Sequence, residues 1–166
     1  QMEFLYPFVN ERIDLTERID LARVLHPATA EQPDMDRRFR AMIIRDLLAT
    51  DDAETAYKES REFTKAHPSS GDAWKLLAES AEGNEQPFEA DRAWSVITDK
   101  AVPTMSIWGE GMINRVRIRT HSTRPEDACP LLEEIVRSQE HMPADLKDDY
   151  EASSTAARCP SANAAL

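Results

Sequence analysis

Residues 71–104 read GDAWKLLAESAEGNEQPFEADRAWSVITDKAVPT, and this stretch decides the fold. Its bulky and small apolar residues recur at helical spacing in two groups, which are Trp74, Leu77, Ala78 and Ala81, then Ala90, Trp94 and Ile97. Pro87 stands in the expected first turn of the second group, where a missing N–H costs nothing. The stretch therefore predicts a pair of helices.

The same pattern returns at one fixed interval in both directions. Trp108 stands one such interval after Trp74, and a step backward by the same interval finds a matching set of residues: Ile43, Ile44, Leu47, Ala56, Ser60, Phe63 and Pro68. Small residues such as Ala78 and Ala90 allow two antiparallel helices to approach closely, and the large residues fill the space between neighbouring pairs. A period of about 34 residues, as found here, indicates a helical repeat.

This pattern resembles the tetratricopeptide repeat family over about residues 35–142, best at 71–104 and more weakly at 37–70 and 105–142. The first repeat lacks the family's aromatic residues at Arg40 and Ser60. The third has Gly111 and Met112 after Trp108, and its second helix is expected about four residues late, at Ala128, Leu132 and Ile135. The resemblance implies an all-α, right-handed solenoid of antiparallel helix hairpins. An irregular helical bundle with a chance echo at this interval stays open as the alternative.

Proline and acidic residues divide the chain into expected segments. We expect an N-terminal extension and helix over 1–33, with a capping-box spacing from Asp14 to Glu17. About three repeats should follow over 34–142, opened by Pro33 and Asp34, with a cap near Asp52 for the next helix. A capping helix is expected over 143–159 and a flexible tail over 160–166.

The two cysteines, Cys129 and Cys159, are expected to form a disulfide. Two antiparallel helices that turn near Pro143 would bring residue 129 opposite roughly residues 156–158, within the reach of a bridge. Such a bridge predicts an oxidising compartment, either the periplasm or the outside of the cell. A chain that begins with Gln1 rather than Met fits a removed leader. Two free thiols in the cytoplasm are the alternative.

Composition excludes several functional classes. The net charge of −11 repels nucleic-acid phosphates, and no apolar run reaches the roughly 18–20 residues that a membrane span needs. His26, His67, His121 and His141 are scattered, and three of them stand near prolines, where exposed loop histidines are common. No phosphate-binding glycine loop or nucleophile elbow occurs. We therefore expect no catalytic residues, no metal and no cofactor.

A protein or peptide is the expected partner, and the charge distribution favours an acidic one. The family resemblance implies that the first helix of each repeat lines a concave groove, and these helices are less acidic than the second helices. The expected groove residues are Arg38, Arg45, Lys75, Glu79, Ile113 and Val116. The apolar start of the chain, with Phe4, Tyr6 and Phe8, is either a docking segment or a cover for the first repeat.

These features predict a non-catalytic protein–protein interaction scaffold, an accessory subunit of a larger assembly in the periplasm or outside the cell. Two alternatives remain. One is an enzyme or small-ligand carrier with a site near the third repeat, lined by Trp108, Met112, Arg115, Arg119 and His121. The other is a cytoplasmic repeat adaptor with reduced cysteines.

Overall fold

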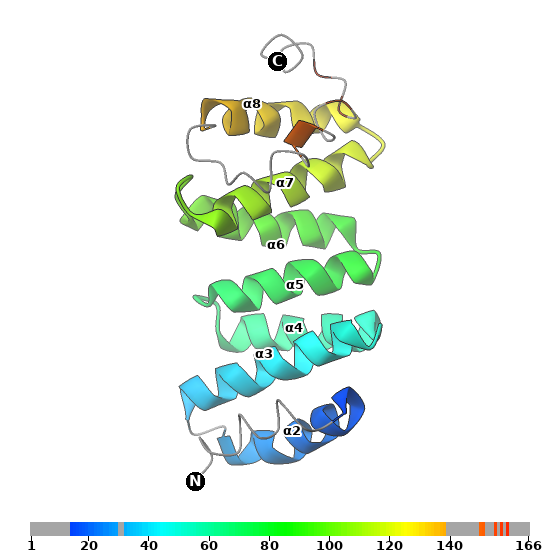
Figure 1. Cartoon of the computed structure of the whole chain (residues 1–166), viewed down its shortest axis with the longest axis vertical. Coiled ribbons are helices and arrows are strands. Elements are labelled where there is room, and N and C mark those ends of the chain that lie inside the picture. The colour runs from blue at the N-terminus through cyan, green and yellow to red at the C-terminus, as the bar shows by residue number, and fades with distance from the viewer. Residues whose placement is uncertain are drawn as a thin grey trace. The chain divides into compact units, whose positions relative to one another are not determined.

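The computed structural model describes residues 14–29, 32–138, 150, 151, 155, 157 and 159. This part of the chain contains seven α-helices and one 3-10 helix, which confirms the predicted all-α class. In chain order they are α2 (Leu15–Thr29), α3 (Pro33–Ala49), α4 (Ala53–Ala66), α5 (Gly71–Gly83), α6 (Pro87–Lys100), α7 (Ser106–Thr120), η1 (Pro125–Ala128) and α8 (Cys129–Arg137) (Figure 1). They form two compact units that divide between Glu85 and Gln86, inside the segment predicted to hold the repeats.

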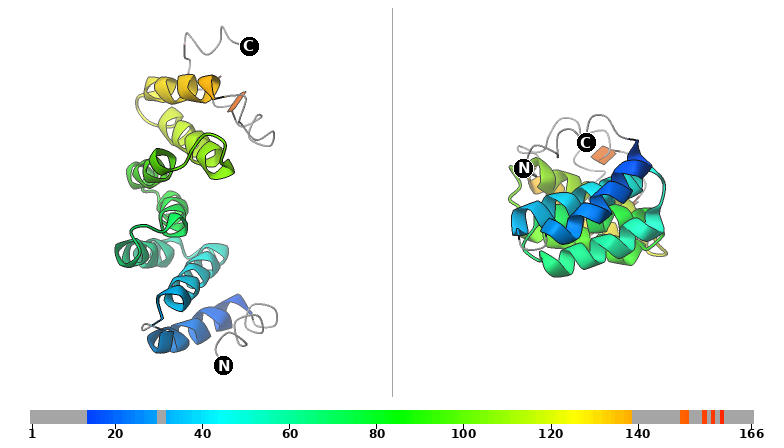
Figure 2. Two further views of the ribbon diagram at one scale, coloured as in Figure 1. Left: turned by 90° about the vertical axis from the view of Figure 1, so that its left-hand side faces the viewer. Right: turned by 90° about the horizontal axis from the view of Figure 1, so that it is seen from below.

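The first unit is organised around α3. This helix packs against α2 on one side, and α3, α4 and α5 are in mutual contact on the other (Figures 1 and 2). The core of this unit combines side chains from all four helices: Ile19, Ala22, Met35, Phe39, Ala41, Met42, Ile43, Ile44, Leu47, Ala56, Phe63, Ala73 and Leu76. Because α3 is enclosed on both sides, most of its residues are buried and only a narrow strip of its surface is exposed.

The second unit is organised around α7. This helix packs against α6 on one side and against η1 and α8 on the other. Its core also includes residues from the C-terminal part of the chain: Trp108, Met112, Ile113, Val116, Ala128, Leu131, Leu132, Ile135, Tyr150, Ala157 and Cys159. Tyr150, Glu151, Thr155 and Ala157 are helical and Cys159 is not; the other residues of the predicted capping helix and the predicted tail lie outside the described residues.

Helix ends recur at the predicted interval. Helix α4 spans 53–66 and α6 spans 87–100. The starts of these two helices, and also their ends, are as far apart in the sequence as Trp74 and Trp108 are. The ends of α3 and α5, at positions 49 and 83, are the same interval apart. The turns that follow α3 and α5 each hold one residue at positive φ, Asp51 at 59° and Glu85 at 55°. Two helices joined by the same left-handed turn are therefore repeated in local structure as well as in sequence.

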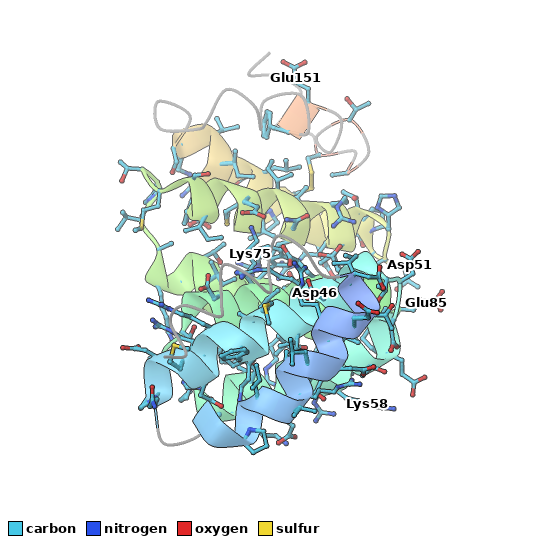
Figure 3. All side chains as sticks on the ribbon, turned by 60° about the horizontal axis from the view of Figure 1, so that its bottom comes forward. Asp46, Asp51, Lys58, Lys75, Glu85 and Glu151 are labelled. Atoms are coloured by element: carbon cyan, nitrogen blue, oxygen red, sulfur yellow. A yellow bond between two sulfur atoms is a disulfide. The ribbon has the colours of Figure 1, made fainter. Side chains whose placement is uncertain are left out.

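The two turns lie at the same edge of the first unit, where Figure 3 shows Asp51 and Glu85. Gly83 brings the end of α5 against the start of α4, since a Cβ added to this glycine would lie 3.1 Å from the Cβ of Ala53. The predicted caps are present here too: the Asp52 carboxylate accepts a hydrogen bond of 3.2 Å from the backbone N–H of Thr55. Short turns and small residues thus hold α3, α4 and α5 close together.

The helix bounds depart from the repeat interval at α7. This helix begins at Ser106, one position later than the repeat interval counted from the start of α5 predicts, and η1 then precedes α8, in agreement with the predicted delay of the third repeat's second helix. The paired tryptophans also stand in different settings. Trp108 is buried in the core of its unit, whereas Trp74 is half-buried and its indole N–H donates to the carbonyl of Pro68 at 2.9 Å. The helix ends are therefore a better record of the repeat than the tryptophans are.

Gly111 allows α7 to approach α6, and we expect Gly111→Ala to destabilise the second unit. An added Cβ would lie 2.8 Å from Cγ2 of Thr98 and 3.5 Å from the Trp94 ring. Thr98 cannot rotate freely, because its hydroxyl donates to the Ser95 carbonyl and accepts from Arg115. Overpacking costs about 1–3 kcal/mol and alanine gains about 1 kcal/mol in helix propensity, so a net loss of about 1 kcal/mol is expected.

The matched variant Thr98→Ser removes Cγ2 and keeps the hydroxyl. In that background Gly111→Ala should become neutral or stabilising, because the new methyl group has room and the helix propensity gain remains. Denaturant unfolding of the four variants measures the coupling. The close contact is refuted as the cause if Gly111→Ala has the same effect with threonine and with serine at position 98.

The predicted disulfide is present. Cys129, the first residue of α8, is bonded to Cys159, with a Cα–Cα distance of 5.6 Å across a sequence separation of 30 residues. Cys159 is buried in the core of the second unit beside Tyr150 and Ala157. The bridge therefore fastens the C-terminal helical residues to the start of α8.

Candidate interaction surface

The exposed strip of α3 carries charged side chains and no large apolar ones. Arg38 and Arg45 are both exposed, and every residue between them is buried or half-buried. Seven residues of α-helix correspond to a rise of about 10.5 Å, so the two arginines stand nearly two turns apart on the same face. Ala41 lies between them and is buried. The strip thus presents two cations on one face of α3, with a small buried residue between them.

Neither arginine is neutralised within the described part of the chain. The neighbouring basic residues of α3 do have partners: Arg37 is 3.4 Å from Asp34, and Nε of Arg40 is 3.0 Å from the Asp36 carboxylate. No such pair forms at Arg38 or Arg45, although the chain as a whole is strongly acidic. Two uncompensated cations of this kind attract an anionic group from outside the unit.

Lys75 and Glu79 lie on α5, which contacts α3. Nζ of Lys75 lies 3.8 Å from Oε1 of Glu79, and each side chain is about one-third exposed. This pair is partly self-compensated, and both residues make further contacts. Four of the six predicted groove residues therefore lie on two adjacent helices, and the α3 arginines are the ones available to a charged partner.

The other two predicted groove residues lie beneath the surface of the second unit. Ile113 is 5% exposed and Val116 is fully buried, and both belong to the core between α7, η1 and α8. Their role in the structure is to hold α7 in place. A direct contact of these two side chains with a groove ligand would require the core to open.

The residues suggested for a site near the third repeat are already used in packing. Trp108 and Met112 are core residues. Arg115 and Arg119 both bind Asp91 of α6, at 3.2 Å and 2.9 Å, and Arg119 also donates to the backbone carbonyl of Asp127 at 3.2 Å. These contacts tie α6, α7 and η1 together.

His121, the remaining residue of that suggested site, is exposed. Its Nδ1 lies 2.8 Å from the Arg117 carbonyl, at the end of α7. The five residues suggested for this site therefore lie in three different settings: the core, an ion-pair network and the exposed surface.

One polar cluster was not expected from the sequence. Nε2 of His67 lies 2.8 Å from Oδ2 of Asp36, which also accepts from Arg40, and the imidazole packs edge-on against Phe63. His67 was interpreted as an exposed loop histidine, but its side chain is only 19% exposed. The interpretation is wrong because the turn after α4 folds back onto the start of α3. The i,i+4 spacing of Asp36 and Arg40 was the only local signal.

Several other predictions concern absences or residues beyond this surface. Among the residues that the structure describes, no group of three or more histidine, cysteine or acidic side chains is placed to hold a metal ion. Within the same ranges, no helix combines the length and hydropathy needed to cross a bilayer. The suggested docking segment, with Phe4, Tyr6 and Phe8, lies outside the described residues.

Comparison of the chain with known protein families, with curated proteins and with solved structures finds no match.

Proposed function

We propose that this chain is a tetratricopeptide-like helical repeat that serves as a non-catalytic protein–protein interaction scaffold. The observation that carries the proposal is the recurrence of helix ends at the interval between Trp74 and Trp108, together with the left-handed turn residues Asp51 and Glu85. Stacked helix hairpins of this period form a right-handed solenoid, whose usual use is to hold extended segments of other proteins.

The α3 strip supports a binding role for the first unit. The neighbouring arginines of α3, Arg37 and Arg40, pair with acidic residues of the same helix. Arg38 and Arg45 remain available, with Lys75 and Glu79 on the adjacent helix. We propose that these residues contact a protein partner that carries acidic groups.

The Cys129–Cys159 bridge supports an oxidising compartment for this function. Disulfides persist in the periplasm and outside the cell and are rare in the cytoplasm. We therefore propose a periplasmic or secreted scaffold, an accessory subunit of a larger assembly. Mass spectrometry of the protein isolated from its native cells without reductant tests the compartment. The disulfide-bonded chain is expected, and a mass two hydrogen atoms higher than that of the bonded chain would support the cytoplasmic adaptor instead.

Affinity capture with charge-reversed variants tests the binding proposal. The immobilised protein should recover a partner in a stoichiometric amount, and Arg38→Glu combined with Arg45→Glu should reduce that recovery at least about tenfold, because like charges then face each other. The matched control is Lys58→Glu with Lys65→Glu, which changes the net charge equally at two exposed positions of α4 with the same seven-residue spacing. Equal recovery by all three proteins would rule out the α3 surface.

A further inference from the structure

The charges on the exposed strip of α3 favour one kind of segment in a partner protein. This inference rests on the proposed function and specifies which partner the scaffold would hold. The large apolar side chains that are exposed within the described residues are Val24, Phe88, Val102 and Met105. None of them lies on α3 or α5. A partner helix would need to bury its own apolar face, and this surface offers nothing apolar to receive it.

The strip instead offers two cations at a fixed separation. Arg38 and Arg45 are about 10.5 Å apart along α3, with buried Ala41 between them. In a polyproline II segment, residues i and i+3 lie on the same face and about 9 Å apart. In a β-strand, residues i and i+3 point to opposite faces. A polyproline II segment with carboxylates three positions apart therefore matches the arginines both in distance and in direction.

We propose that Arg38 and Arg45 bind an extended, polyproline II segment of a partner protein through two acidic side chains at positions i and i+3. Each arginine receives one carboxylate, and the backbone of the segment passes over Ala41. Because both ion pairs are exposed to water, the interaction is weak, reversible and sensitive to salt. The specificity comes from the spacing of the two carboxylates.

Fluorescence anisotropy with labelled proline-rich peptides tests the spacing. The first peptide carries two glutamates three positions apart, the second carries two adjacent glutamates, and the third has glutamines in place of the spaced glutamates. The spaced glutamate peptide should bind the protein roughly 2–30-fold more tightly than the glutamine peptide, since two exposed ion pairs contribute that range. It should also bind more tightly than the adjacent pair.

Two variants connect the preference to the strip. Arg38→Gln with Arg45→Gln should abolish the preference for the spaced glutamates, whereas Lys58→Gln with Lys65→Gln on α4 should leave it unchanged. The variant with Arg38→Gln and Arg45→Gln should still fold, because neither arginine has a partner within the described residues. Equal affinity for adjacent and spaced glutamates would overturn the inference, and so would a preference that survives the loss of both arginines.

The capture and peptide experiments distinguish a failure of the scaffold function from a failure of the polyproline II inference. If capture of the native partner depends on Arg38 and Arg45 but the peptides show no spacing preference, the polyproline segment is wrong and the scaffold function stands. If the peptides follow the predicted order but capture ignores both arginines, the strip binds such segments and its proposed use in holding the native partner is wrong.

Discussion

Replacing Asp46 with alanine is expected to lower the free energy of unfolding of the first unit by about 3–5 kcal/mol. The Asp46 carboxylate on α3 receives Nε of Arg18 from α2 at 2.6 Å and pairs with a second nitrogen of the same guanidinium, close to where α2 crosses α3 (Figure 3). The two side chains are only 5% and 13% exposed. Removal of the carboxylate would take two close charge-assisted hydrogen bonds from a guanidinium that lies in a largely dry interface.

The same helix supplies a control. Asp34 is 84% exposed and pairs with Arg37, so Asp34→Ala should cost no more than about 1 kcal/mol. Denaturant unfolding, with hydrogen exchange of the α2 amides to report on the first unit, measures both variants. A second variant, Arg18→Met with Asp46→Leu, should recover most of the loss, because it removes both charges together. An Asp46→Ala protein as stable as Asp34→Ala would show that the pair does not hold α2 on α3.

Loss of the disulfide has the second large expected effect. Replacement of Cys129 and Cys159 by serine should lower the free energy of unfolding of the second unit by about 3–4 kcal/mol in the chain-entropy model, given the separation of 30 residues between the bonded cysteines. The amides of the C-terminal helical residues should exchange fastest, because the bond no longer fastens them beside α8. Tyr150 and Ala157 would then leave the core that they share with Trp108.

Hydrogen exchange read by mass spectrometry locates this effect. Peptides that contain Tyr150 and Ala157 should lose protection, while peptides from α3 and α4 in the first unit should be unchanged. Reduction of the wild-type protein provides an independent comparison and should give the same pattern. Uniform loss of protection in both units, or none in either, would contradict the local role of the bridge.

The helix pattern and the disulfide were predictable for related physical reasons. Proline and aspartate at helix starts have local effects on the backbone, and Pro33, Asp52 and Pro87 take the expected places at the starts of α3, α4 and α6. The pairing of Cys129 with Cys159 followed from counting residues along two antiparallel helices. Each inference needed only spacing along the chain and the known dimensions of a helix.

The ion pairs between helices were not predictable in the same way. Asp91 binds two arginines that lie 24 and 28 residues further along the chain, and His67 binds Asp36 across 31 residues. Such pairs depend on the rotation of each helix about its own axis. A register shift of one residue changes this rotation by about 100°, since a helix has about 3.6 residues per turn. Ile113 and Val116 lie in the core of the second unit, although the repeat register assigned them to a groove.

Site-specific photo-crosslinking from α3, in the cells that naturally produce the protein, tests the account most directly. A photo-reactive residue at Arg37, which is 47% exposed beside Arg38, should give one adduct of defined mass with a single partner protein. The same residue at Lys58 of α4, which is 69% exposed, should give little or none. Adducts of equal yield from both positions, or none from α3 while the protein is folded, would contradict a scaffold that presents the α3 strip to its partner.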